Sequence, residues 1–304
     1  MSIRPVKRLI TSQPTIEGAG VHLRRAFGFH NTSAFDPFLL LDDFRNDIPA
    51  DYLAGFPWHP HRGIETITYV LAGTVEHGDS MGNKGAIGAG DIQWMTAGSG
   101  IIHQEMPKGD PEGRMHGFQL WANLPADKKM TAPRYQEVKA PEIPEVTDDD
   151  GTKTRIVTGS FWGKRGPVVG IAADPVYIDV SVPPGRRKVL PVETTRHAFA
   201  YVFAGSGKFC NASGPLAVPT ESVGWLDVEP PKDAADRSLI LFDSGDEVVV
   251  QAGENGIRFL LVSGKPLQEP VAWYGPIVMN TQAQLQEAFT DLEKGTFLKT
   301  EKPR

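Results

Sequence analysis

The chain has 304 residues, 40% of them hydrophobic, with 32 glycines, 25 prolines and a formal net charge of −6. The negative charge argues against electrostatic binding to nucleic acid over a broad surface, and a single cysteine, Cys210, excludes an internal disulfide framework. The basic N-terminus is not followed by a signal-peptide pattern, and no window approaches the roughly 18 apolar residues of a membrane span. We therefore expect a soluble, cytoplasmic protein with about two domains.

Short alternating runs, separated by glycine and proline, dominate the first half of the chain. Residues 66–73 and 118–125 are two of them. Alternation of this kind predicts β-strands, and many short strands with frequent turns predict an antiparallel sandwich or barrel. The exception is a short C-terminal helix predicted over residues 281–295, with Thr281 as its N-cap.

A short repeat indicates that the β pattern occurs twice. The sequence Tyr-Val-(Leu or Phe)-Ala-Gly begins at Tyr69 and again at Tyr201, each time in a predicted strand. Between them, residues 125–153 are polar and rich in proline, as a connector is. We place the boundary near residue 140 and predict domains over residues 1–140 and 141–304.

Histidines with strand spacing predict a metal site in the first domain. Residues i and i+2 of a strand point to the same face, so His59 shares a face with His61, and His103 shares one with Glu105. If both strands line one barrel interior, three imidazoles and a carboxylate converge. Such a set suits a transition metal and leaves open positions for a substrate or dioxygen. The corresponding positions of the second half are not histidines, so only the first domain is expected to hold the metal.

The motifs around these residues resemble the pirin family. They occupy residues 36–44, 59–66, 93–107 and 116–124, in the family's order, within a resemblance that runs from about residue 3 to residue 295. The resemblance implies an all-β bicupin, with two antiparallel, jelly-roll-like cupin barrels in one chain.

It also implies one divalent metal, usually iron (Fe²⁺), held in the N-terminal barrel by His59, His61, His103 and Glu105; nickel, manganese, copper, zinc and cobalt stay open. Cupins outside this family place a glutamate ligand shortly after the His-x-His pair, where this chain has Glu65. Glu65 has the same parity as the two histidines and competes with Glu105. The pirin pattern favours Glu105, and Glu65 is then expected to orient a ligand.

The resemblance further implies quercetin 2,3-dioxygenase activity, in which a flavonol ring is opened with dioxygen and carbon monoxide is released. Glu105 would take the proton of the flavonol hydroxyl as a catalytic base. Phe56 and Met95 would form flat apolar walls, Arg62 would meet a phenolate or carboxylate, and His116 would contact the substrate. The alternative is a redox-sensitive regulator that binds a transcription factor or a metabolic enzyme as its protein partner, without direct contact with nucleic acid.

Overall fold

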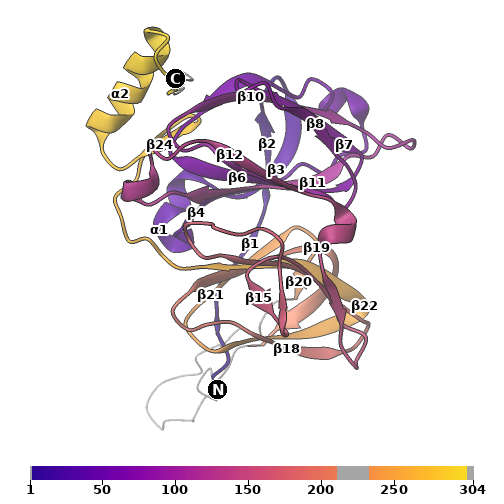
Figure 1. Cartoon of the computed structure of the whole chain (residues 1–304). Helices are drawn as coiled ribbons and strands as arrows, with labels where there is room; N and C mark the ends of the chain where they lie inside the picture. The colour runs from indigo at the N-terminus through magenta and orange to yellow at the C-terminus, as the bar shows by residue number, and fades with distance from the viewer. Residues whose placement is uncertain (1, 211–232, 300–304) are drawn as a thin grey trace, which may run out of the picture. The chain divides into compact units, whose positions relative to one another are not determined.

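The computed structural model describes residues 2–210 and 233–299 and confirms the predicted all-β fold with a short C-terminal helix. The described residues divide into two compact units (Figure 1). The first unit contains residues 13–143, 167–174 and 266–299. The second contains residues 2–12, 144–166, 175–210 and 233–265.

The first unit is built from two antiparallel sheets. The larger has the strand order β12-β9-β6-β11-β4-β3-β2, and the smaller has the order β5-β10-β7-β8. These strands are β2 (Gln13–Glu17), β3 (Val21–Phe27), β4 (Phe38–Asp43), β5 (Phe56–His61), β6 (Ile64–Ala72), β7 (Thr74–Asp79), β8 (Lys84–Ile87), β9 (Ile92–Thr96), β10 (Ile101–Lys108), β11 (His116–Asn123) and β12 (Arg134–Val138). Leu23 and Val70 of the larger sheet meet Val75 and Ile87 of the smaller in one buried cluster, so apolar side chains of both sheets form the core.

Short helices and a hairpin complete this unit. They are α1 (Thr32–Phe35), α2 (Gln282–Glu293), the hairpin of β23 (Ala272–Tyr274) and β24 (Ile277–Met279), and the 3₁₀ turns Phe29–Asn31, Pro49–Asp51, Ala126–Lys128 and Ala140–Glu142. Figure 1 shows α2 next to β24, and buried residues of both belong to one apolar cluster.

Helix α2 begins where the sequence predicts. The side chain of Thr281 accepts a hydrogen bond from the backbone N–H of Gln284, whose side chain bonds back to the Thr281 N–H in a capping box. Leu285 and Ala288 are its buried residues. Among the residues that the structure describes, no helix is both long and apolar enough to cross a membrane.

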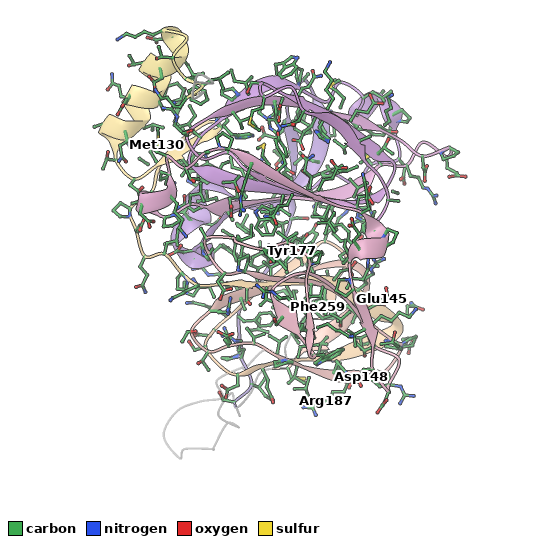
Figure 2. All side chains as sticks on the ribbon, viewed as in Figure 1. Met130, Glu145, Asp148, Tyr177, Arg187 and Phe259 are labelled. Atoms are coloured by element: carbon green, nitrogen blue, oxygen red, sulfur yellow. The ribbon has the colours of Figure 1, made fainter. Side chains whose placement is uncertain are left out.

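The second unit has one large antiparallel sheet. Its main order is β1-β21-β19-β22-β17-β14-β13, with β18 paired to β22, β20 paired to β19, and β15 paired to β16 as a separate hairpin. The strands are β1 (Val6–Thr11), β13 (Glu145–Thr147), β14 (Lys153–Thr158), β15 (Ser160–Phe161), β16 (Lys164–Arg165), β17 (Val176–Val182), β18 (Arg187–Pro191), β19 (His197–Phe209), β20 (Ala234–Ala235), β21 (Ser238–Phe242) and β22 (Glu247–Gly264). Figure 2 shows Phe259 among these strands, where it is fully buried, and Arg187 at the edge of the unit, where it is exposed.

The units differ at both termini from the division at residue 140. β1 pairs with β21 along residues 6–11, and residues 2–12 belong to the second unit. The hairpin β23–β24 and α2 belong to the first unit, because Val278 packs against Ile64, Met95 and Ile101 in its core. A polar, proline-rich connector indicates a boundary in the middle of the chain. It cannot show that the N-terminal residues belong to the second unit and the C-terminal residues to the first.

Candidate metal centre

Three histidines of the first unit form one group of potential metal ligands. Nitrogen atoms of His59, His61 and His103 all lie within 4.8 Å of one another. His59 and His61 come from β5, and His103 from β10, which pairs with β5 so that His103 lies opposite His59. The alternation within β5 and the antiparallel pairing with β10 therefore bring the three rings to one place.

Hydrogen bonds orient two of these rings. Nδ1 of His59 lies 2.8 Å from the carbonyl oxygen of Pro57, and Nδ1 of His61 lies 3.0 Å from that of Pro276. A carbonyl oxygen only accepts, so both Nδ1 atoms carry the proton and both Nε2 atoms present a lone pair. These two Nε2 atoms lie 3.1 Å apart. Two lone pairs at this distance repel each other unless a cation or a proton lies near them.

The protonation states of the three imidazoles also suit a metal. Burial lowers the pKa of His61 to about 3, lowers the pKa of His59, and brings the pKa of His103 well below its usual range. The rings are therefore neutral at pH 7, the form that binds transition metals. Both ring nitrogens of His103 are buried without a hydrogen-bond partner among the described residues. The donor set thus fits a divalent transition metal.

Glu105 lies in the same cavity but apart from the three-histidine group. The pairing of β10 with β5 shifts register between His103 and Glu105, which places Glu105 opposite Phe56. Oγ1 of Thr68 lies 3.0 Å from one carboxyl oxygen of Glu105, and the amide nitrogen of Gln119 donates to the other at 3.4 Å. The sequence predicts four converging ligands, whereas the structure groups three and holds the fourth beside them.

The contacts of Glu105 depend on its proton. Oγ1 of Thr68 also lies 2.6 Å from the side-chain oxygen of Gln119. A hydroxyl has one proton to donate, so if Thr68 donates to Gln119, its contact with Glu105 is a hydrogen bond only when Glu105 is protonated. Burial raises the pKa of Glu105 to about 7, although the hydrogen bond from Thr68 opposes this. The carboxyl group is therefore close to half-protonated at neutral pH.

Glu65 lies outside this cavity, so the parity argument for it fails. Gly63 has φ +79 and separates β5 from β6, which begins at Ile64, so the alternation of β5 does not continue to Glu65. The Glu65 carboxylate instead accepts a hydrogen bond of 2.8 Å from the hydroxyl of Thr96, its cross-strand neighbour on β9.

A largely apolar cavity of about 620 Å³ opens beside the histidines. Its walls include the aromatic residues Phe29, Phe44, Tyr52, Phe56, Trp58, Trp121 and Trp273, together with His59, His61, Thr68, Glu105 and Gln119. The ring of Trp121 meets that of His61 edge-on at 5.0 Å and lies 5.9 Å from the ring of Trp273. The size and the aromatic walls suit a flat organic molecule.

One of the four predicted substrate contacts, Phe56, lies on the cavity wall. Arg62, Met95 and His116 do not line it. The Arg62 guanidinium is buried against Asp291, Met95 is fully buried in an apolar cluster, and His116 lies next to Asp43. These three residues therefore do not contact a substrate in this cavity. They are near the histidines in sequence but do not lie on the face that lines the cavity.

Several residues of the site are not among those predicted from the sequence. Trp121 and Gln119 lie in a recognised motif, and their common strand parity is the signal that points both toward the cavity. Trp273 and Pro276 carry no such signal, because they come from the distant β23–β24 hairpin.

Comparisons with known proteins agree with this architecture. A family model described as Pirin matches residues 20–122, and a second, described as the Pirin C-terminal cupin domain, matches residues 177–298. A pirin-like protein of Caulobacter vibrioides is 44% identical to this chain, over 98% of the chain and 100% of that protein.

Two further relatives bear the name of one activity. A Pseudomonas aeruginosa protein named "Putative quercetin 2,3-dioxygenase" is 38% identical, over 96% of the chain and 97% of that protein. A solved structure of quercetin 2,3-dioxygenase from Acinetobacter baumannii is similar, with a TM-score of 0.83 and 29% identity, over 97% of this chain and 99% of that one. The resemblance noted in the motifs is thus confirmed in both halves, and the chain belongs to the pirin family, with two cupin domains.

Proposed function

We propose that this chain is a metal-dependent dioxygenase of the quercetin 2,3-dioxygenase type. It would open the ring of a flavonol with dioxygen and release carbon monoxide. The observation that carries the proposal is the grouping of three neutral imidazoles, two of which, those of His59 and His61, lie on the wall of an aromatic cavity of about 620 Å³. The names of the relatives from Pseudomonas aeruginosa and Acinetobacter baumannii support this reaction class. The single cysteine of the chain supports a cytoplasmic location.

His59, His61 and His103 would hold one divalent transition metal, which we propose to be iron, and Glu105 would complete the ligand set. Bound there, the ion would supply Lewis acidity toward the flavonol hydroxyl and redox chemistry toward dioxygen. The Nδ1–H bonds to Pro57 and Pro276 support this assignment, because they turn both Nε2 atoms toward the site.

The other residues of the cavity would bind and orient the flavonol. Trp121 and Phe56 offer flat faces beside the histidines, and Trp58 stands at the exposed margin of the same cavity. Stacking on such rings orients a planar substrate and excludes water from one of its faces.

Glu105 would accept the proton of the flavonol hydroxyl. In the metal-free protein burial raises the pKa of Glu105 to about 7, so its carboxylate is a stronger base than that of an ordinary glutamate. The hydroxyl of Thr68 and the amide of Gln119 hold the two carboxyl oxygens in place. When Glu105 takes up a proton, Thr68 can turn its own hydroxyl toward Gln119, so both hydrogen bonds persist.

The test combines metal analysis with a quercetin assay. Protein loaded anaerobically with Fe²⁺ is mixed with quercetin, and oxygen is then admitted while flavonol absorbance and carbon monoxide are followed. About one metal per chain, with carbon monoxide formed in step with flavonol loss, is the expected result. One metal per chain without turnover would contradict the dioxygenase proposal and turn attention to a regulatory role.

A further inference from the structure

The residue next to a candidate ligand is held by the far end of the chain. Arg62 follows His61, and its side chain is only 2% exposed. Its guanidinium donates to the carboxylate of Asp291 on α2 at 2.8 Å and to the carbonyl oxygen of Phe297 at 2.8 Å. The ring of Phe297 also lies 4.3 Å from the guanidinium carbon. Its Nε also donates to the carbonyl oxygen of Ser99 at 2.7 Å, so the buried cation is matched by one carboxylate, two carbonyls and one aromatic face.

The backbone on either side of Arg62 is attached to the same C-terminal segment. Arg62 forms a parallel bridge with Ile277, and the Val278 N–H donates to the Arg62 carbonyl at 3.1 Å. The buried ammonium of Lys129 donates to the carbonyls of Gly63 at 2.8 Å and Val278 at 2.9 Å. A Cβ at position 63 would lie 1.9 Å from the Val278 carbonyl oxygen, so only glycine allows this approach.

These contacts bring the Pro276 carbonyl to His61. Pro276 directly precedes β24, and its carbonyl oxygen accepts the hydrogen bond from His61 Nδ1 at 3.0 Å. A displacement of β24 would therefore remove the acceptor that fixes the tautomer and the ring orientation of His61. We call the segment from β23 to Phe297 the C-terminal clamp; it includes the hairpin, α2 and the turn after it.

We propose that the Arg62–Asp291 ion pair is a positioning device, which keeps the C-terminal clamp against His61 and thereby sets the metal affinity of the site. Hydrogen-bond partners behind a metal ligand typically contribute about 10- to 100-fold in affinity. Asp291 touches neither the metal ligands nor the cavity wall, so it acts through the clamp. The proposal rests on the metal centre of the proposed function, but it does not depend on the oxygenase reaction.

The first test compares two matched substitutions in the full-length protein. Asp291→Asn removes a carboxylate that is 14% exposed and paired with Arg62 and Lys299. The control, Asp91→Asn, removes a carboxylate of the same unit that is 13% exposed and paired with Lys139, away from the clamp. Affinity for Co²⁺ is measured against a competing chelator, and circular dichroism and thermal unfolding check that both variants are folded.

We expect Asp291→Asn to weaken Co²⁺ binding about tenfold and Asp91→Asn to leave it within about twofold of the wild type. Unchanged affinity in Asp291→Asn would overturn the proposal. An equal loss in both variants would overturn it as well, because the effect would then be one of general stability. In addition, ¹⁵N spectra of the metal-free protein should show a single Nδ1–H tautomer for His61 in the wild type and a tautomer mixture in Asp291→Asn.

A second test uses the unchanged protein, so it does not depend on how a variant folds. Coupling between two sites is reciprocal: if the clamp strengthens metal binding, bound metal must also stabilise the clamp. Hydrogen exchange with and without Zn²⁺ should show slower exchange in peptides covering residues 272–297 when the metal is bound. Slower exchange confined to peptides around residues 56–61 and 101–108 would overturn the proposal. Both results can be interpreted even if quercetin is not turned over. The clamp proposal and the dioxygenase proposal are therefore tested separately.

Discussion

The Nε2 atoms of His59 and His61 lie 3.1 Å apart, and each faces the other with a lone pair. The orientation follows from the carbonyl oxygens of Pro57 and Pro276, each of which accepts a hydrogen bond from an Nδ1–H. The lone pairs of the two Nε2 atoms repel each other, and a cation bound by both would remove this repulsion. The four predictions below start from this relationship and from the cavity next to it.

Removal of one histidine of the group should abolish stoichiometric metal binding. His103→Ala deletes a ring whose two nitrogens have no hydrogen-bond partner among the described residues, so no hydrogen bond to the described part of the chain is lost with it. We expect metal content to fall from about one per chain to near zero, measured by elemental analysis after loading and desalting. His116→Ala is the control, because His116 lies next to Asp43 outside the group. Full metal content in His103→Ala would refute the site.

Substitution of the two competing carboxylates, Glu105 and Glu65, should have different effects on quercetin turnover. Glu105→Gln keeps the shape of the side chain but removes the base, and loss of a general base costs about 10²- to 10⁴-fold in rate. Glu65→Gln alters a group that bonds to Thr96 away from the cavity, so quercetin turnover should change by less than about threefold. The reverse order of the two losses would make Glu65, and not Glu105, the carboxylate ligand.

Burial of Glu105 should lower this residue's contribution to the stability of the metal-free protein as the pH rises. Its pKa is about 7 in the folded protein, against an ordinary value of 4.5. Below pH 4.5 the carboxyl group is protonated in both states and carries no penalty. Between pH 4.5 and 7 the unfolded chain gives up this proton while the folded chain keeps it, so the contribution of Glu105 to the free energy of unfolding falls by about 3 kcal/mol.

Glu105→Gln provides the measurement, since glutamine does not titrate. Denaturant unfolding of both metal-free proteins between pH 4 and pH 8 should show the variant gaining stability over the wild type as the pH rises. A stability difference that is the same at every pH would mean that Glu105 does not titrate in this range.

Truncation of an aromatic wall residue should weaken flavonol binding without unfolding the protein. Trp58 lines the cavity, yet it is 53% exposed, so Trp58→Ala removes little buried area. We expect KM for quercetin to rise about fivefold, the equivalent of about 1 kcal/mol of stacking, with little change in thermal unfolding. Met130, labelled in Figure 2, is 50% exposed and does not line the cavity, so Met130→Ala should leave KM unchanged. Equal KM values for both variants would exclude Trp58 from substrate binding.

The sequence predicts the parts of the site that depend on strand spacing. His59 and His61 converge because they lie two residues apart in β5, and His103 joins them because β10 pairs with β5. Spacing fails where regular alternation is interrupted. Gly63 turns the chain between His61 and Glu65, and a turn of this kind changes which face a residue occupies without altering the count of residues. Glu105 keeps the face of His103, because β10 pairs with β7 without a register shift, but an extra residue of β5 sets it opposite Phe56.

Contacts between distant segments were also beyond prediction from spacing. Arg62 was expected to meet a substrate, because it is a cation next to a ligand. Its partner Asp291 lies on a helix whose existence was predicted but whose packing was not. Apolar spacing predicts that α2 has a buried face. It does not predict that Leu285 and Ala288 pack against Ala272, Ile277 and Met279 of the hairpin.

The chain is synthesised from its N-terminus, so His61 is made long before Pro276, the residue that accepts its hydrogen bond. A ribosome releases the motif residues of β5 and β10 long before Pro276 and Asp291 exist, so the nascent domain holds every recognisable ligand but lacks the acceptor for one of them. By the proposal above, the site reaches its full metal affinity only after the chain has been synthesised as far as Phe297. A message cut short near its end would yield a protein with an intact motif and an impaired centre.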